Sequence, residues 1–464
     1  MNDIVMEDVT QPPVSEKERK ARIINGVQEL TQVYRANGGQ NYFKPHEVHL
    51  NDDLRFTVQE PRDYFSTKVA EEEETKSDES DSQRLVAGFF DPVQHTPSNQ
   101  VVRPTKTGIV KFAYHFATKA GKSPGEIKTS IHPTAFKVMD RERLQHCGED
   151  TQRERRVMMA LRREGFRKPR QNPLVEPAYA DVRKHTYDYF PQWRFYEDES
   201  NQYMMTDFAS NGSLVQYTKK RIDSYNVEIA HLMSTYVILS GFPVTTAVTK
   251  LWRQEALCIF SGIVEAVAYM HAKGVCHLDL DVYNIVIDAM KHPIIVDFGS
   301  SEVAAVDGSV GRGRPILCKH NFGAPEVVAH NRNVERSPGV DGRAADMYSL
   351  GAILYWLLFI YPGESPIVDP MKNDPRWLQH LIHHLAPGSG VHEGGNCAIC
   401  RSLVPLETDV VQLFQALLTN LAQRITITSL LDIIRGRDYQ VHGDTITRSQ
   451  AVFEELRKSM HGGS

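Results

Sequence analysis

The stretch GVCHLDLDVYN, residues 274–284, decides how the rest of the chain is interpreted. A long helical pattern ends just before it, and its polar residues lie among apolar ones, so we expect a loop held on a folded core. Asp279 on such a loop can orient a hydroxyl group and accept its proton, and Asn284 can offer a neutral oxygen to a divalent cation. The residue types therefore predict a catalytic loop.

A second loop supplies the other ligand that the cation would need. HPIIVDFGSSE, residues 292–302, is a short apolar strand followed by Asp297. The residues between Asn284 and Asp297 predict a β-hairpin, which would bring the two loops together. Carboxylate and amide oxygens are ligands of Mg²⁺, so Asn284 and Asp297 are expected to hold the metal of a phosphate-transfer site.

In this order and spacing the motifs resemble those of the eukaryotic protein kinase family, over roughly residues 100–435. HLDLDVYN stands where the family has H-R-D-L-x-x-x-N, DFG matches at 297–299, and APE matches at 324–326. The resemblance implies an α+β, bilobal fold with a β-rich amino-terminal lobe and an α-helical carboxy-terminal lobe. It also implies transfer of the γ-phosphate of ATP, with Mg²⁺ or Mn²⁺, to a protein hydroxyl, most often of serine or threonine.

The same resemblance implies structural roles in the helical half. Asp346, in the motif DMYSLG, would hold the backbone of the catalytic loop, residues 277–284. Arg424 would pair with Glu326 of the APE motif, as a buried ion pair that is costly to break from one side. The stretch from DFG to APE, residues 297–326, would be the activation segment.

Two motifs nearer the amino terminus resemble the parts that bind the nucleotide. TAFKVMD and ERRVMMAL would carry the catalytic lysine and its glutamate partner, Lys137 and Glu154, although by themselves these residues would be interpreted as a solvated surface pair. QYMMTDFASNGSL resembles the strand and hinge behind the adenine, although its apolar residues equally suit an ordinary core. The implied nucleotide contacts are Lys137, Val110, Ala135, Thr206, Asp207, Ala209 and Val286.

Three positions depart from the pattern of the family. RPTKTG at 103–108 stands where G-x-G-x-x-G belongs, and only Gly108 remains, so the phosphate-covering loop is degenerate. Leu278 replaces an arginine that pairs with a phosphorylated activation segment, so we expect activity that does not depend on phosphorylation there. Asp281 replaces a lysine that contacts the γ-phosphate; its carboxylate needs a cation or a basic substrate to offset it, or faces away.

These departures leave a second hypothesis open. A pseudokinase, which keeps the fold and acts through protein contacts, would explain the missing glycines, whereas the retained lysine, glutamate and metal ligands favour catalysis. A small-molecule kinase is disfavoured by the APE motif. With this set of variants the chain is most similar to divergent alveolate and stramenopile kinases, and the apicomplexan FIKK group is the nearest that can be named.

Changes in amino-acid composition along the chain predict its division into regions. A helix over 15–37 has an amphipathic pattern and would pack on the main body or on a regulatory partner, and the acidic run after residue 70 is too charged to order itself. The predicted regions are an amino-terminal extension at 1–70, an acidic linker at 71–84, the two lobes at 85–210 and 211–440, and a carboxy-terminal tail at 441–464.

Composition also bears on the cellular compartment, the partners and a possible zinc site. The six cysteines have no disulfide-framework spacing and the first residues lack an apolar core, so the cytosol or nucleus is expected. We expect a protein substrate, no nucleic-acid partner and no membrane span, since the longest apolar run, 351–361, is too short. Cys397 and Cys400 form one C-x-x-C, for which free thiols are favoured over a zinc site.

Overall fold

The structure is a computed structural model, and its residues group into two compact units, which are described separately. The first unit comprises Met1–Cys147 and Trp193–Phe208, and the second comprises Gly148–Gln192 and Ala209–Ser464. The described residues are 47–49, 54–58, 84–92, 102–104, 108–120, 127–147, 151–161, 193–197, 201–209, 211–238, 241–288, 291–360, 369–386, 399, 405–437, 439 and 444–461.

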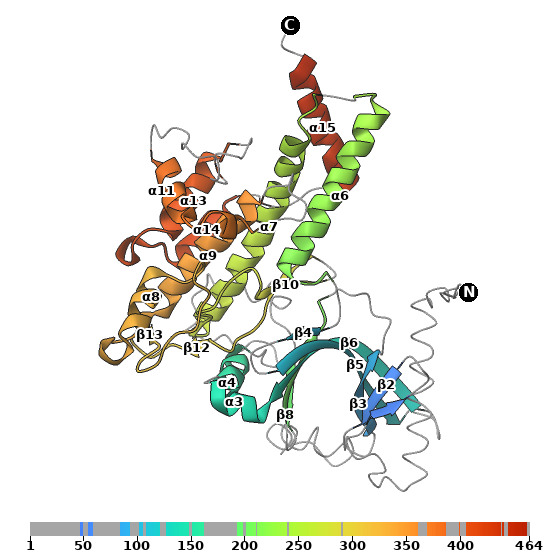
Figure 1. The fold of residues 1–464 in the computed structure, drawn as a ribbon, viewed down its shortest axis with the longest axis vertical. Coiled ribbons are helices and arrows are strands. Elements are labelled where there is room, and N and C mark those ends of the chain that lie inside the picture. Colours follow the sequence, from blue (N-terminus) through green and yellow to red (C-terminus); the bar gives the residue numbers. More distant parts are fainter. Residues whose placement is uncertain are drawn as a thin grey trace, which may run out of the picture. The chain divides into compact units, whose positions relative to one another are not determined.

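The first unit is built on an antiparallel sheet of eight strands, in the order β1-β2-β3-β5-β6-β8-β7, with β4 paired to β5 (Figure 1). Its two longest strands, β5 and β6, are rich in β-branched and aromatic residues and pair along their whole length. The strands are β1 (Glu47–His49), β2 (Leu54–Val58), β3 (Arg84–Pro92), β4 (Val102–Pro104), β5 (Gly108–Ala120), β6 (Ile127–Asp140), β7 (Trp193–Glu197) and β8 (Asn201–Asp207).

This sheet contains the predicted β-rich regions and extends beyond them. The strand expected in QYMMTDF is present as β8, and the stretch 100–140 supplies β4, β5 and β6. Strands β1 and β2 come from the stretch assigned to the amino-terminal extension, so the sheet begins before residue 85. A short helix, α3 (Arg141–Cys147), follows β6, where Asp140 accepts the backbone N–H of Arg143 at 2.9 Å.

The second unit is mainly helical, as expected. Its central helix, α9, covers the predicted apolar run and is buried from Ala345 to Phe359, so that run is a core helix. The helices are α4 (Thr151–Leu161), α6 (Leu214–Thr235), α7 (Val244–Ala272), α8 (Pro325–Arg332), α9 (Gly342–Phe359), α10 (Pro370–Asn373), α11 (Trp377–Leu385), α13 (Thr408–Leu417), α14 (Ile427–Arg435) and α15 (Thr445–His461), with single 3₁₀ turns at Val334–Arg336 and Leu421–Gln423.

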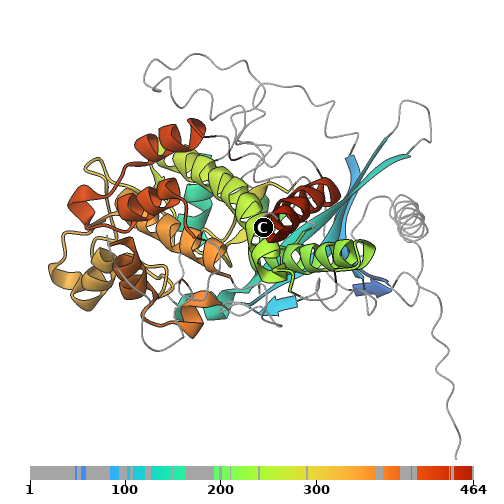
Figure 2. The ribbon, with the colours of Figure 1, turned by 90° about the horizontal axis from the view of Figure 1, so that it is seen from above.

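Helices α6, α7 and α15 pack side by side, as Figures 1 and 2 show from two directions. Ser213 begins α6 with a capping box, and Ile229 and Leu232 near its far end are buried, so this helix packs on the core along most of its length. Helix α7 is long and apolar enough to cross a membrane, but 72% of its most apolar window is buried inside the protein. That burial is typical of a core helix.

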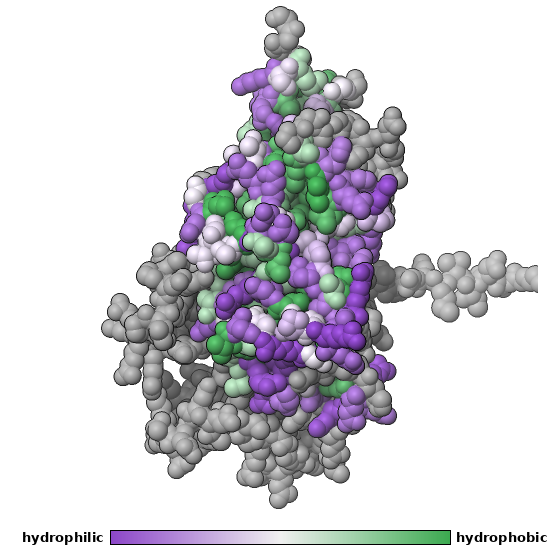
Figure 3. Space-filling view, turned by 90° about the vertical axis from the view of Figure 1, so that its left-hand side faces the viewer, coloured by the Kyte–Doolittle hydropathy of each residue, from purple (hydrophilic) through white to green (hydrophobic). Residues whose placement is uncertain are grey.

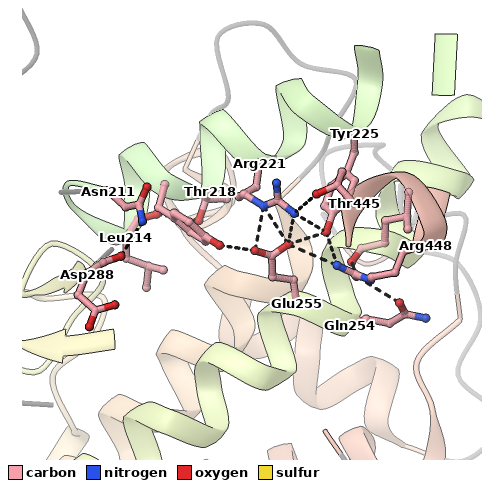
Figure 4. Close-up of polar contacts among 12 residues, drawn as sticks. Asn211, Leu214, Thr218, Arg221, Tyr225, Gln254, Glu255, Asp288, Thr445 and Arg448 are labelled. Carbon is pink, nitrogen blue, oxygen red and sulfur yellow. Dashed lines mark hydrogen bonds and ion pairs between the residues drawn. The ribbon is translucent and has the colours of Figure 1, made fainter. Parts of the chain in front are cut away.

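A buried polar cluster joins these three helices (Figure 4). Glu255 of α7 accepts hydrogen bonds from Arg221 Nε and Nη2 of α6, both at 2.9 Å, and from the hydroxyls of Tyr217 and Tyr225. Arg448 of α15 lies 3.7 Å from the same carboxylate and donates to the Tyr225 hydroxyl at 2.6 Å. The residues named as a carboxy-terminal tail therefore include a helix that is fixed to the core by charge.

Three small sheets shape the loops of this unit. They pair β9 (Val275–Cys276) with β12 (Glu302–Val303), β10 (Ile285–Ile287) with β11 (Pro293–Ile295), and β13 (Ser309–Val310) with β14 (Val340–Asp341), all antiparallel. The surface is mixed, and Figure 3 shows hydrophobic patches among hydrophilic residues on one face. The large exposed hydrophobic residues, which include Val227, Val306 and Ile382, belong to different segments, as is normal for a folded protein.

Several predictions fall on residues that lie outside the described part of the chain. They are the amphipathic helix at 15–37, the acidic linker up to residue 83, and the C-x-x-C pair Cys397 and Cys400. These remain predictions.

Candidate active site

One buried carboxylate holds the backbone of the loop at 277–284. Asp346 of α9 is completely buried and accepts the backbone N–H groups of His277 and Leu278, both at 2.8 Å. The Nε2 atom of His271 lies 2.9 Å from the same carboxylate. The predicted role of Asp346, to hold the backbone of this loop, is therefore confirmed.

The side chain of Asn284 contacts Asp279 within this loop. The side-chain Nδ2 of Asn284 donates to the backbone carbonyl of Asp279 at 2.8 Å and to its Oδ2 at 3.3 Å. The backbone N–H of Asn284 donates to Asp281 Oδ1 at 3.1 Å. Asn284 thus contacts Asp279 through its amide nitrogen, and its amide oxygen is the atom that would serve as a cation ligand.

The loop of Asp297 meets this loop through the predicted hairpin. Strands β10 and β11 pair with Ile285 opposite Ile295, and the N–H of Val296 donates to the carbonyl of Asn284 at 2.9 Å. Asp297 itself has φ +66°, a left-handed conformation that costs energy in a non-glycine residue and occurs often at functional sites. The hairpin and the meeting of the two loops are confirmed, whereas the roles assigned to Asn284 and Asp297 stay predictions.

The environment of Asp279 favours the uncharged acid more than water does. Burial and the neighbouring Asp281 carboxylate raise the pKa of Asp279 to about 6, against the opposing effects of Lys319 and His277. Its Oδ1 also accepts the backbone N–H of Lys319 at 3.0 Å. A carboxylate whose pKa lies close to neutrality can take up a proton from a hydroxyl and release it again.

The predicted nucleotide contacts of the first unit share one face of the sheet. Val110 lies opposite Lys137, and Ala135 lies opposite Thr206, in antiparallel register. Opposite residues and residues two apart on one strand point to the same face, so these four side chains line it together. Lys137 is 9% exposed, which contradicts the alternative of a solvated surface lysine.

Glu154 lies on α4, in the second unit. Its side chain is buried, as are Val157, Met158 and Leu161 of the same helix, and α4 packs against β9 and β12. The preceding residue, Arg153, donates from Nη2 to the carbonyl of Gly299 at 2.9 Å, which ties α4 to the loop of Asp297. Lys137 and Glu154 belong to different units, so their pairing stays a prediction.

The remaining predicted contacts are also divided between the units. Thr206 and Asp207 end β8 in the first unit, whereas Ala209 and Val286 belong to the second. Ala209 is buried, and the segment after it bonds to β10, where the N–H of Asn211 donates to the carbonyl of Ile287 at 3.1 Å. The predicted enclosure of the adenine by Val110, Ala135 and Val286 therefore stays a prediction.

The residue that replaces the usual arginine, Leu278, is part of a hydrophobic cluster. It is 3% exposed and has φ +68°. The cluster takes residues from the activation segment, α8, β14 and α9, and so attaches the activation segment to the catalytic loop without charge. Its buried members are Cys276, Leu278, Val310, Ile316, Ala324, Val327, Val340, Ala345 and Tyr348.

Neutral and paired polar groups fix the rest of the activation segment. Asn331 of α8 bonds to both the N–H and the carbonyl of Ile316, at 2.8 and 2.7 Å. Glu302 accepts the N–H of Gly311 at 3.0 Å and forms an ion pair with Arg314. At the APE motif, Arg424 forms the expected ion pair with Glu326, which is thereby confirmed.

The sequence analysis did not identify Lys319 as a residue of this site. Lys319 of the activation segment forms an ion pair with Asp281, which is fully buried. Asp281 therefore offers no free carboxylate to a basic substrate, and of the alternatives considered for it, an offsetting cation is the one observed. The signal in the sequence was a lysine five residues before APE, but nothing in the pattern connects it with a residue 38 positions earlier.

The predicted metal ligands at this site are of a kind that suits Mg²⁺. Asn284 and Asp297 provide one amide and one carboxylate oxygen, which are hard ligands of the kind that Mg²⁺ prefers. A second group of ligand types, His271, Cys276 and Asp346, has its donor atoms within 4.8 Å of one another. There the Asp346 carboxylate is already used by His271 and by two backbone N–H groups, so that cluster is structural.

Comparisons with known proteins agree with these features. The family description "protein kinase domain" matches residues 191–432. The chain is 32% identical over 145 residues to CBL-interacting serine/threonine-protein kinase 17 of Arabidopsis thaliana, which covers 28% of this chain and 30% of that protein. It is 38% identical over 112 residues to CBL-interacting protein kinase 24 of Oryza sativa subsp. japonica, covering 24% and 23%. The chain thus spans less than a third of the length of these relatives.

Proposed function

The chain belongs to the protein kinase family, and from this premise we propose that it transfers the γ-phosphate of ATP to hydroxyl groups of proteins. The observation that carries the proposal is the junction of the two loops, where Asn284 bonds to Asp279 at 2.8 Å and to the residue before Asp297 at 2.9 Å. Serine and threonine are the proposed acceptors, because the relatives that name an acceptor are serine/threonine kinases.

Each residue has a distinct part in the proposed reaction. Asp279 orients the acceptor hydroxyl and takes its proton, Asn284 and Asp297 would hold the metal, and Lys137 would bind phosphate oxygens with Glu154 as its partner. The metal, when bound, neutralises the charge that develops on the transferred phosphate. Asp346 holds the backbone of His277 and Leu278, directly before Asp279, so that little motion is needed when the hydroxyl arrives.

The finer features belong to the same proposal. The loop at 103–108, with Gly108 as its one glycine in the pattern, would cover the phosphates less closely than a glycine-rich loop. Arg103 lies opposite Val110 in the β4–β5 hairpin, so a basic residue comes close to the strand that carries a predicted adenine contact. Membership of the FIKK group rests on the sequence alone, and the relatives named above are plant kinases.

The experiment that tests the proposal measures both transfer and binding. The full chain is incubated with radiolabelled ATP, Mg²⁺ and a generic protein acceptor, beside Lys137→Met and Asp297→Ala. We expect incorporation by the wild type and none above background by either variant, since each lacks one predicted nucleotide or metal contact. No incorporation by the wild type, with ATP still raising its melting temperature, would instead select the pseudokinase.

Activity is expected not to depend on phosphorylation of Ser300, Ser301 or Ser309. Leu278 and its hydrophobic neighbours already hold the activation segment, and no arginine stands at position 278 to bind a phosphate. Ser301 is also fully buried and donates to the carbonyl of His277 at 3.1 Å. Phosphatase-treated and autophosphorylated protein should therefore give initial rates within about two-fold of one another.

The phosphorylation state of both samples is verified by intact mass before the rates are compared. A rate that rises ten-fold or more with phosphate on one of these serines would contradict the prediction. Ser309→Ala provides a matched control, because its hydroxyl bonds only locally, to Asp307 at 2.7 Å, among the contacts described here.

A further inference from the structure

Asp281 is an anionic group inside the folded catalytic loop. It is completely buried, and its Oδ1 accepts the backbone N–H groups of Tyr283 at 2.5 Å and Asn284 at 3.1 Å, which shapes the turn between Asp279 and Asn284. Two N–H groups do not neutralise a full charge, and an uncompensated buried carboxylate is strongly unfavourable. The loop therefore needs a cation from elsewhere in the fold.

Lys319 supplies that cation and reaches the loop at three points. Its ammonium forms the ion pair with Asp281 and lies 4.9 Å from the centre of the Tyr283 ring. Its backbone N–H donates to Asp279 Oδ1 at 3.0 Å. One residue of the activation segment thus contacts both carboxylates of the catalytic loop, one through its side chain and one through its backbone.

The exposure of the two partners differs. Asp281 has no exposed side-chain surface, whereas 43% of the Lys319 side chain is exposed. An ammonium group has three N–H donors, so Lys319 can bind Asp281 and still present positive charge to the solvent side of the loop. The backbone contact of Lys319 with Asp279 places this charged residue next to the proposed catalytic carboxylate.

We propose that Lys319 is a positioning residue for phosphoryl transfer, which provides from the activation segment the positive charge that the catalytic loop lacks at Asp281. This inference rests on the proposed function. Lys319 opposes the repulsion that Asp281 would exert on phosphate and on Asp279, and its backbone N–H holds the Asp279 carboxylate at 3.0 Å. The usual arrangement, a lysine within the loop, is replaced here by a pair of opposite charges across two segments.

Lys319→Met is expected to lower kcat by about ten-fold or more, with little change in the KM for ATP. Without the ammonium, the buried carboxylate of Asp281 has lost the counter-charge with which it pairs in the wild type. Negative charge that develops on the transferred phosphate would then no longer be offset from the activation segment. Initial rates at varied concentrations of ATP and acceptor separate kcat from KM.

A second substitution separates charge from structure. Asp281→Asn keeps an oxygen that can accept the N–H groups of Tyr283 and Asn284 but has no charge, so adding it to Lys319→Met should raise kcat back toward its wild-type value. Lys319→Arg should keep most of the activity as the conservative variant. Lys220→Met, on an exposed position of α6, is the matched control and should behave as the wild type.

The outcomes distinguish this inference from the proposed function. No transfer by the wild type would refute the function, whereas an unchanged kcat in Lys319→Met would refute the positioning role alone. The melting temperature of each variant, measured without turnover, shows that the variant is folded before its rate is compared. A loss of kcat in folded Lys319→Met that Asp281→Asn does not reverse would also overturn the inference.

Discussion

Asp279→Asn is expected to lower the rate of phosphoryl transfer by about 10²–10⁴-fold, the usual contribution of a positioned general base. The amide oxygen can still accept the N–H of Lys319, so the loop should keep its shape and ATP should bind as before. What is lost is the group that takes the proton of the acceptor hydroxyl. Initial rates at saturating ATP, together with ATP titrations, measure the two effects separately.

The same substitution is expected to stabilise the protein at neutral pH. The pKa of Asp279 is about 6 in the folded chain, above its ordinary value of 3.8, so the fold favours the protonated form. Its stabilising contribution is complete below the ordinary value and is lost as the pH rises through about 6. Above that pH the wild type carries a cost of at most roughly 3 kcal/mol that asparagine avoids.

Thermal unfolding at several pH values measures this effect. Asp279→Asn should melt a few degrees higher than the wild type at pH 8, at about 2–4 °C per kcal/mol, and the difference should shrink as the pH falls toward 4. Asp223→Asn, at an exposed position of α6, is the control. A variant that retains full transfer, or that melts lower than the wild type at pH 8, would disprove the environment described for Asp279.

Glu255→Ala is expected to give the largest loss of stability, about 3–5 kcal/mol. The substitution leaves the buried guanidinium groups of Arg221 and Arg448 without their counter-charge and removes the acceptor of the Tyr217 and Tyr225 hydroxyls. Because these residues come from α6, α7 and α15, the attachment of the last helix should weaken. Chemical denaturation of the full chain measures the loss, and Glu255→Gln shows how much of it is due to charge.

The pH dependence of stability provides an independent check. Burial alone would raise the pKa of Glu255, but the hydrogen bonds and charge of Arg221, with the hydroxyls of Tyr217 and Tyr225, hold it below its ordinary value. Its contribution is therefore present above the ordinary pKa and is lost as the pH falls through the lowered one. Glu255→Gln should lose less stability than the wild type on acidification, and Glu335→Ala, at an exposed site, should match the wild type.

Short motifs with fixed local geometry were predictable from the sequence. Asp279 and Asn284 are five residues apart on one loop, and a hairpin of ordinary length separates them from Asp297, so their approach follows from the chain itself. The contacts of Asp346 and Arg424 are long-range. Both residues nevertheless belong to recognisable motifs, and so do their partners, which lie in the catalytic loop and in the APE motif.

Contacts between charged residues on distant elements were not predictable in the same way. Lys319 and Asp281 are 38 residues apart, and Arg448 lies 194 residues from the side-chain amide of Gln254 that it contacts. On a helix, an isolated charged residue such as Glu255 is normally solvated, and only packing of α6, α7 and α15 buries it. The early strands β1 and β2 escaped notice because strands of three and five residues have little pattern of their own.

The hydrophobic contacts of Leu278 bear on how such a protein can be controlled in a cell. A phosphate can be added or removed within seconds by other enzymes, whereas a leucine among Val310, Ile316 and Tyr348 offers nothing for them to modify. We therefore expect such a protein to be active once it has folded, without a modification of the activation segment. Its output would then be governed by how much of it is made, how long it survives and which proteins it encounters.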